Sequence, residues 1–63
     1  MTIKECRELK NLSCQEVAKL LKIGLDEYCT YEEFPEEMPI MLGLAFSLLV
    51  GISYDNIFFG TAV

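Results

Sequence analysis

Apolar residues recur at helical spacing in the first third of the chain, in two segments that each begin with a capping pattern. In a capping box, a Ser or Thr side chain and a Glu side chain three residues later bond each other's backbone amides at the start of a helix. Two such pairs are present: Thr2 with Glu5, and Ser13 with Glu16. The apolar positions behind them predict helices over residues 2–10 and 13–22, which Asn11 and Gly24 are expected to end.

Three further helices are predicted, over residues 25–33, 39–50 and 53–59. Pro35 should end the first of these, because proline disfavours helical backbone at the residue before it. Gly51 should end the second, because glycine readily adopts the left-handed conformation found at helix ends. No segment alternates with the two-residue period of a strand, so the predicted fold class is all-α, with five short helices.

The helix predicted over residues 39–50 has almost no polar face, whereas a helix at a protein surface normally keeps one. Two interpretations remain open: this is a central core helix, or part of its surface meets a second copy or another partner. Residues expected at such an interface, in a homodimer, are Met41, Ala45, Leu48, Phe58 and Phe59. For the two phenylalanines, closure of the core is an equal alternative.

With 63 residues the chain has room for a single domain, predicted over residues 3–60 with 61–63 as a short C-terminal tail. A domain of this size buries only about 60% of the surface that its unfolded chain exposes, so marginal stability is expected. The uncharged run over residues 38–54 is shorter than the roughly 20 apolar residues needed to span a bilayer. A cytoplasmic protein without a membrane partner is therefore expected.

The net charge of −5 is unevenly distributed along the chain. All five basic residues lie within residues 1–22, together with three acidic ones, so that part carries 5 − 3 = +2. From Ile23 onward there are seven acidic residues and no basic one. This part of the chain forms either a solvated acidic surface or a surface that a basic partner recognises. The residues assigned to the acidic face are Asp26, Glu27, Thr30, Glu33, Glu36 and Glu37.

The residue types needed for metal binding or nucleophilic catalysis are scarce. The chain has no His, and its three Cys, at positions 6, 14 and 29, lack the spacing of zinc ligands. Adjacent carboxylates on a helix do not face one another, so they do not make an acid–base pair. We therefore expect no metal, no cofactor and no enzymatic activity, with Cys6 in the core and Cys14 and Cys29 nearer the surface.

Short helices with a tight turn between the second and the third are typical of helix-turn-helix proteins. Segments resembling the Cro and phage-repressor type of these proteins, also called the XRE family, are IKECRELKNLS (3–13), EVAKLLKI (16–23) and LAFSLLVGISYDNIF (44–58). Tyr31 and Glu32 resemble the aromatic–Glu pair that ends the third helix in that family. The resemblance implies a lambda-repressor-like helix-turn-helix domain of phage or mobile-element type.

The resemblance also implies a structural ion pair, because an Arg of the first helix typically pairs with the Glu that ends the third in this family. The corresponding residues are Arg7 and Glu32. Such proteins read DNA with the start of the second helix, the exposed face of the third and the loop that follows. Residues that DNA binding would use here are Ser13, Cys14, Gln15, Lys10, Lys19, Lys22 and Thr30.

The chain departs from the family at these DNA-reading positions. Cys14 stands where the family commonly has Gln, and Asp26 and Glu27 stand where polar or basic residues would meet DNA. Because DNA binding depends on basic residues that release counterions, it should be weak on the usual face. Two functions remain open. One is a regulator whose acidic face binds a basic protein, as an antirepressor or an inhibitor of a DNA-binding protein or nuclease. The other is a dimeric regulator that binds an operator directly.

Overall fold

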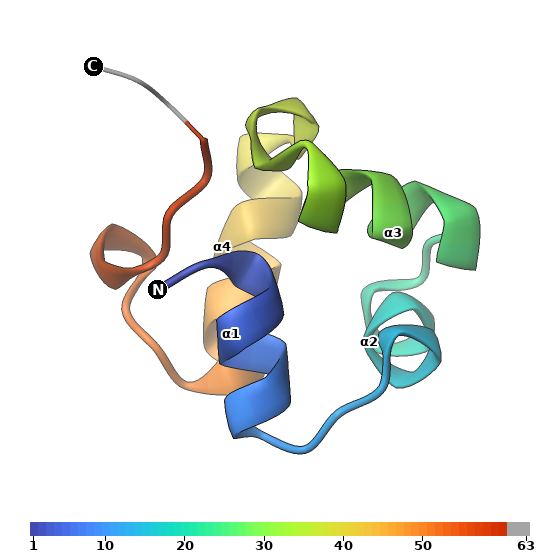
Figure 1. Ribbon diagram of the computed structural model, residues 1–63, viewed down its shortest axis with the longest axis horizontal. Coiled ribbons are helices and arrows are strands. Elements are labelled where there is room, and N and C mark those ends of the chain that lie inside the picture. Colours follow the sequence, from blue (N-terminus) through green and yellow to red (C-terminus); the bar gives the residue numbers. More distant parts are fainter. Residues whose placement is uncertain (61–63) are drawn as a thin grey trace.

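The computed structural model describes residues 1–60, which form four α-helices and two 3-10 turns and contain no strand (Figure 1). The helices are α1 (Ile3–Leu9), α2 (Cys14–Leu21), α3 (Leu25–Glu33) and α4 (Ile40–Val50), and the turns are η1 (Pro35–Glu37) and η2 (Tyr54–Asn56). The all-α fold class is confirmed. The predicted tail, 61–63, lies outside the described residues. None of the helices in residues 1–60 has the length and apolarity needed to cross a membrane.

Both predicted capping boxes are present, at the starts of α1 and α2. The Thr2 hydroxyl accepts from the Glu5 amide at 3.1 Å, and the Glu5 carboxylate accepts from the Thr2 amide at 2.8 Å. Ser13 and Glu16 make the same two bonds at 3.0 Å and 2.8 Å. The bond from the Thr2 backbone lowers the pKa of the Glu5 carboxyl, as expected for a carboxylate that accepts an amide.

Ser13→Ala should lower the free energy of unfolding by about 1 kcal/mol, because the Glu16 amide loses its acceptor. Thermal denaturation followed by circular dichroism should show a fall in Tm of about 4–8 °C. Ser53→Ala is the matched control, since Ser53 precedes η2 without a side-chain capping bond. Equal losses in the two variants would show that the Ser13 cap contributes nothing specific.

The second helix ends within one residue of its predicted end, at Leu21, but the residue that terminates it is Lys22 and not the predicted Gly24. Lys22 takes the left-handed conformation with φ 62°, and its amide donates to the Ala18 carbonyl, whereas Gly24 has φ −70° and precedes α3. Ile23 packs against the core directly after this turn, which is the apolar contact that commonly accompanies such helix ends. At the end of α1, Asn11 has φ 57°, consistent with its predicted role as a terminator.

The prediction of a fifth helix over residues 53–59 is wrong. This segment contains only a 3-10 turn, at Tyr54–Asn56. Ile57 is already extended, with φ −104° and ψ 130°, and Phe58 forms an isolated β-bridge with Thr2. β-Branched and aromatic residues are poor helix formers, and a helix this short is unstable without tertiary support. Pairing with the N-terminus therefore determines the conformation of this segment.

The core receives side chains from every helix and from the segment after η2. Its buried apolar residues are Ile3, Cys6, Val17, Ala18, Tyr28, Tyr31, Met38, Phe46, Val50 and Ile57. Helix α4 contributes Phe46 and Val50 from one face only, while Met41 and Leu48 on it are 78% and 84% exposed. The interpretation of α4 as a helix surrounded by core is therefore wrong for the single chain.

Helix α4 also approaches η2 closely, and Gly43 makes this approach possible. A Cβ atom at Gly43 would lie 3.0 Å from the ring of Tyr54, closer than side chains normally pack. The Tyr54 ring stacks in turn on Phe59, with the ring centroids 4.7 Å apart. Phe59 therefore helps to close the domain over α4, one of the two roles predicted for it.

Candidate functional site

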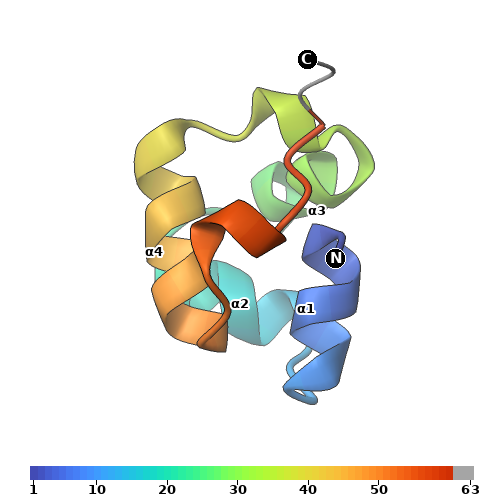
Figure 2. The same cartoon turned by 90° about the vertical axis from the view of Figure 1, so that its left-hand side faces the viewer.

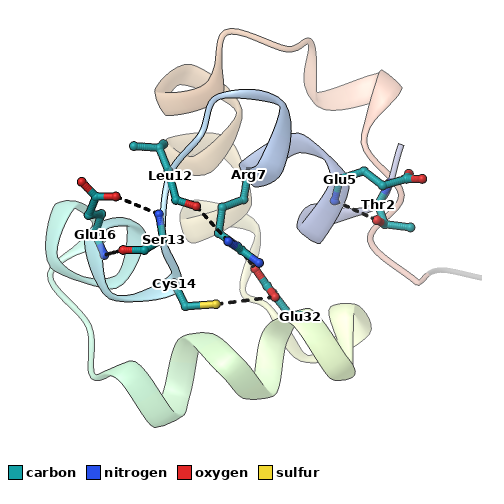
Figure 3. A network of polar contacts seen from close by, with 8 residues as sticks. All are labelled: Thr2, Glu5, Arg7, Leu12, Ser13, Cys14, Glu16 and Glu32. Atoms are coloured by element: carbon teal, nitrogen blue, oxygen red, sulfur yellow. Dashed lines mark hydrogen bonds and ion pairs between the residues drawn. The ribbon is translucent and has the colours of Figure 1, made fainter.

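A small network of polar contacts joins α3 to α1 and to the loop between α1 and α2 (Figure 3). Arg7 Nε donates to Glu32 Oε2 at 2.5 Å, and Arg7 Nη1 donates to the Leu12 carbonyl at 2.8 Å. The Cys14 thiol donates to the other Glu32 oxygen at 3.8 Å. The side chains of Arg7 and Glu32 are each only 12% exposed. The ion pair implied by the family resemblance is thus present between these two residues.

The electrostatics of this network indicate a structural role. The hydrogen bond to Glu32 raises the pKa of the Arg7 guanidinium, which favours its charged form. Burial raises the pKa of the Cys14 thiol, and the negative Glu32 raises it further. Burial is also the main cause of the raised pKa of Tyr28. A reactive cysteine needs a lowered pKa, so Cys14 is not an activated nucleophile.

Helix α3 has an inward side with tyrosines and an outward side with carboxylates. Tyr28 and Tyr31 are buried, which leaves Asp26, Glu27 and Glu33 exposed to solvent. Of these three carboxylates, Glu27 is held by a side-chain contact within the helix, whereas Asp26 takes part only through its backbone carbonyl. The Tyr31 hydroxyl donates to Glu27 Oε2 at 2.7 Å, which raises the pKa of the tyrosine, and the Thr30 hydroxyl donates to the Asp26 carbonyl at 2.9 Å. Thr30 itself is half-buried.

Turn η1 extends this acidic surface beyond the end of α3. Glu36 and Glu37 lie in η1, are exposed, and follow α3 with only Phe34 and Pro35 between them and Glu33. We call the exposed carboxylates the acidic face: Asp26, Glu27, Glu33, Glu36 and Glu37. In the described part of the chain, the Arg7–Glu32 contact is the only ion pair, so no basic side chain neutralises this face.

The residues considered for DNA binding lie on α2 and in the turns on either side of it, except Thr30, which lies on α3. Lys10, Lys19, Lys22 and Gln15 are exposed, but the Ser13 hydroxyl is used by its capping bond. Lys19 lines an open groove of about 310 Å³ together with Leu12, Glu16 and Leu20. Cys14 is half-buried and directed at Glu32 rather than at solvent. The cations are at the surface and Ser13 makes its predicted cap, but the contact between Cys14 and Glu32 was not predicted from the sequence.

The residues considered for an oligomer interface divide into two groups. Met41, Ala45 and Leu48 are exposed on α4, and Phe58 is exposed near the N-terminus, whereas Phe59 is half-buried on Tyr54. The structure adds two residues to the α4 group that sequence reasoning missed, Ile40 and Leu44. Leu44 stands three residues after Met41 and four before Leu48, so helical spacing was a signal that could have identified it.

Comparisons with protein-family models, with curated proteins and with solved structures find no match for this chain. Across residues 1–60, no group of Cys, Asp and Glu is arranged to hold a metal ion. Two surfaces of this chain, the acidic face and the exposed side of α4, are the candidate functional sites among the described residues.

Proposed function

We propose that the protein is a small regulator of helix-turn-helix type whose acidic face binds a basic protein. The observation that carries this proposal is the set of five exposed carboxylates on α3 and η1 with no basic side chain paired to them. From Ile23 onward the sequence contains no basic residue at all. An acidic surface of this kind favours rapid, salt-sensitive association with a positively charged partner.

The arrangement of α2 and α3 supports the helix-turn-helix part of the proposal. These helices are joined by the three residues 22–24, which include Gly24, and they pack against each other. A connection of this length is typical of the motif. In helix-turn-helix proteins the outward side of the second of these helices enters the major groove. Here that position is taken by Asp26, Glu27 and Glu33, which repel phosphate.

The partner that fits this face best is a protein surface that itself binds nucleic acid. Such surfaces carry clustered Lys and Arg side chains, which pair well with carboxylates presented in a fixed arrangement. The Arg7–Glu32 contact holds α3 in place, so little conformational freedom is lost when the acidic face is bound. A repressor bound through its DNA-reading face, or a nuclease bound through its basic cleft, would be kept from its nucleic acid. The regulator would then act as an antirepressor or an inhibitor.

Titration against a panel of purified basic DNA-binding domains and basic nucleases tests the proposal. We expect binding to at least one of them, with an affinity that falls as salt is raised. A Glu33→Gln/Glu36→Gln variant should bind at least about tenfold more weakly. The matched control is Glu8→Gln/Asp55→Asn, which removes the same two charges from exposed positions outside the acidic face. Equal weakening by both variants, or no binding at low salt, would contradict the proposal.

A second candidate function is direct binding to an operator, and the exposed cations on α2 and at the ends of α1 and α2 favour it. Lys10, Lys19 and Lys22 remain free to contact a phosphate backbone beside the acidic face. In a dimer these three cations would be doubled. Duplex DNA binding that depends on salt and on these lysines is the result that would favour this function over protein binding.

A further inference from the structure

Two of the three cysteines lie next to each other where α2 meets α3. Cys14 is the first residue of α2, and Cys29 lies in the middle of α3. The Cys14 thiol donates to Glu32 Oε1 at 3.8 Å, and Glu32 follows Cys29 by three residues, so Cys29 and Glu32 share one side of α3. The Cys14 thiol is also in hydrogen-bond contact with the Cys29 thiol.

The packing of the two helices brings these cysteines together although residues 15–28 separate them in the sequence. Helices α2 and α3 are joined by residues 22–24 and pack against each other. Figure 2, turned by 90° from Figure 1, shows them together on the side of the molecule opposite η2. Cys29 is exposed to solvent there, whereas Cys14 is half-buried beside it. A reagent in water therefore reaches Cys29 directly.

The contact between the two thiols suits a disulfide. A disulfide places its sulfur atoms about 2.05 Å apart and its Cα atoms about 4.4–6.8 Å apart, so it forms only between cysteines that already lie close together. A pair of thiols in hydrogen-bond contact needs only a small movement to reach this geometry. Cys6 is completely buried in the core, so it is out of reach of a reagent in water.

We propose that Cys14 and Cys29 form a reversible disulfide that links α2 to α3 when the protein meets a small, diffusible disulfide. The exposed Cys29 thiolate attacks one sulfur of that disulfide, whose S–S bond breaks and releases one small thiolate. The Cys14 thiolate then attacks Cys29 Sγ in the mixed disulfide and releases the second small thiolate. The two cysteines lose two electrons and two protons, and the small disulfide gains them as two thiols.

Exposure determines the order of the two attacks. Burial and the contact with Glu32 keep Cys14 from reacting first with a reagent in water. The second attack is intramolecular, so the closeness of the two sulfur atoms compensates for the lack of activation at Cys14. The acidic face has no part in these steps, so this proposal and the proposed binding of a basic protein can fail independently.

The disulfide should stabilise the domain, because it closes the loop of residues 14–29 in the unfolded chain and so restricts that chain. The Arg7–Glu32 ion pair involves neither cysteine and should remain. The oxidised protein should therefore have a Tm about 10 °C above that of the reduced protein, measured by circular dichroism with and without dithiothreitol. An oxidised protein with a lower Tm than the reduced one would show that the folded domain does not accommodate the link, which would overturn the proposal.

Incubation of the folded protein with oxidised glutathione, followed by alkylation in denaturant and mass spectrometry, tests the link directly. The parent should lose about 2 Da, carry no glutathione and keep one thiol for alkylation, at Cys6. Peptide mapping should find Cys14 joined to Cys29 in a single chain. Dithiothreitol should return all three thiols.

Three variants separate the roles of the cysteines, and circular dichroism should show that each keeps the parent helix content. Cys14→Ser should stop at the mixed disulfide and carry one glutathione on Cys29. Cys29→Ser should stay unmodified, because its two remaining thiols are shielded. Cys6→Ala is the matched control and should form the disulfide like the parent. A parent that keeps glutathione on Cys29, or that forms a disulfide only between two chains, would overturn the proposal.

Discussion

Replacing Arg7 with methionine should lower the free energy of unfolding by about 3 kcal/mol. The substitution leaves the Glu32 carboxylate, 12% exposed, without its cation and removes the donor to the Leu12 carbonyl. A nearly buried charge without a partner costs far more than an ion pair at the surface contributes. In a domain of 63 residues this loss should lower Tm by about 15 °C.

Urea denaturation measures this loss of unfolding free energy. One further variant tests whether the unpaired carboxylate causes the loss, and another is a control for removing a buried polar group nearby. Arg7→Met/Glu32→Leu should regain most of the lost stability, because no unpaired carboxylate remains. Tyr28→Phe removes a buried hydroxyl that has no hydrogen-bond partner among the described residues, so it should change stability by less than about 1 kcal/mol. If Arg7→Met alone were as stable as the parent, the pair would not be holding α1 and α3 together.

Phe46→Ala should cost about 4 kcal/mol, because Phe46 is completely buried and its ring packs near that of Tyr28. The surrounding side chains collapse only partly into the cavity that remains, so contacts as well as hydrophobic burial are lost. Leu48→Ala, two residues further along α4, should change the stability of the monomer by less than about 0.5 kcal/mol because Leu48 is 84% exposed.

Thermal denaturation in dilute solution compares these two α4 variants without a contribution from association. A much larger loss of unfolding free energy in Phe46→Ala than in Leu48→Ala would show that only the Phe46 side of α4 contributes to the stability of the single chain. Similar losses from Phe46→Ala and Leu48→Ala would mean that α4 is covered on both sides in the single chain. In that case Leu48 would not be available for the interface expected on α4.

Local signals in the sequence were sufficient to predict most of the helix boundaries. The capping boxes depend only on residues three apart, and Gly51 ends α4 with φ 69° as predicted. The helix predicted after α4 was wrong because the conformation of that segment depends on residues far away in the sequence. Phe58 pairs with Thr2 at the other end of the chain, a contact that periodicity within residues 53–59 does not reveal.

The candidate site was predicted in part for similar reasons. Exposure of Glu33, Glu36 and Glu37 follows from their charge, because an unpaired carboxylate is costly to bury. The engagement of Cys14 with Glu32 was not predicted, since it depends on how α2 crosses α3. Which side of α4 faces outward was also ambiguous in the sequence, because both sides of that helix are apolar.

The claim that this protein acts through protein contacts is tested most directly by fluorescence anisotropy of a random-sequence DNA duplex at low salt. We expect no saturable binding by the parent protein, because carboxylates occupy the outward side of α3. A Glu33→Lys/Glu36→Lys variant, measured in the same titration, should gain salt-sensitive DNA binding. If the parent binds clearly, with a salt dependence that Lys19→Gln and Lys22→Gln reduce, the protein is an operator-binding regulator and its acidic face does not exclude DNA.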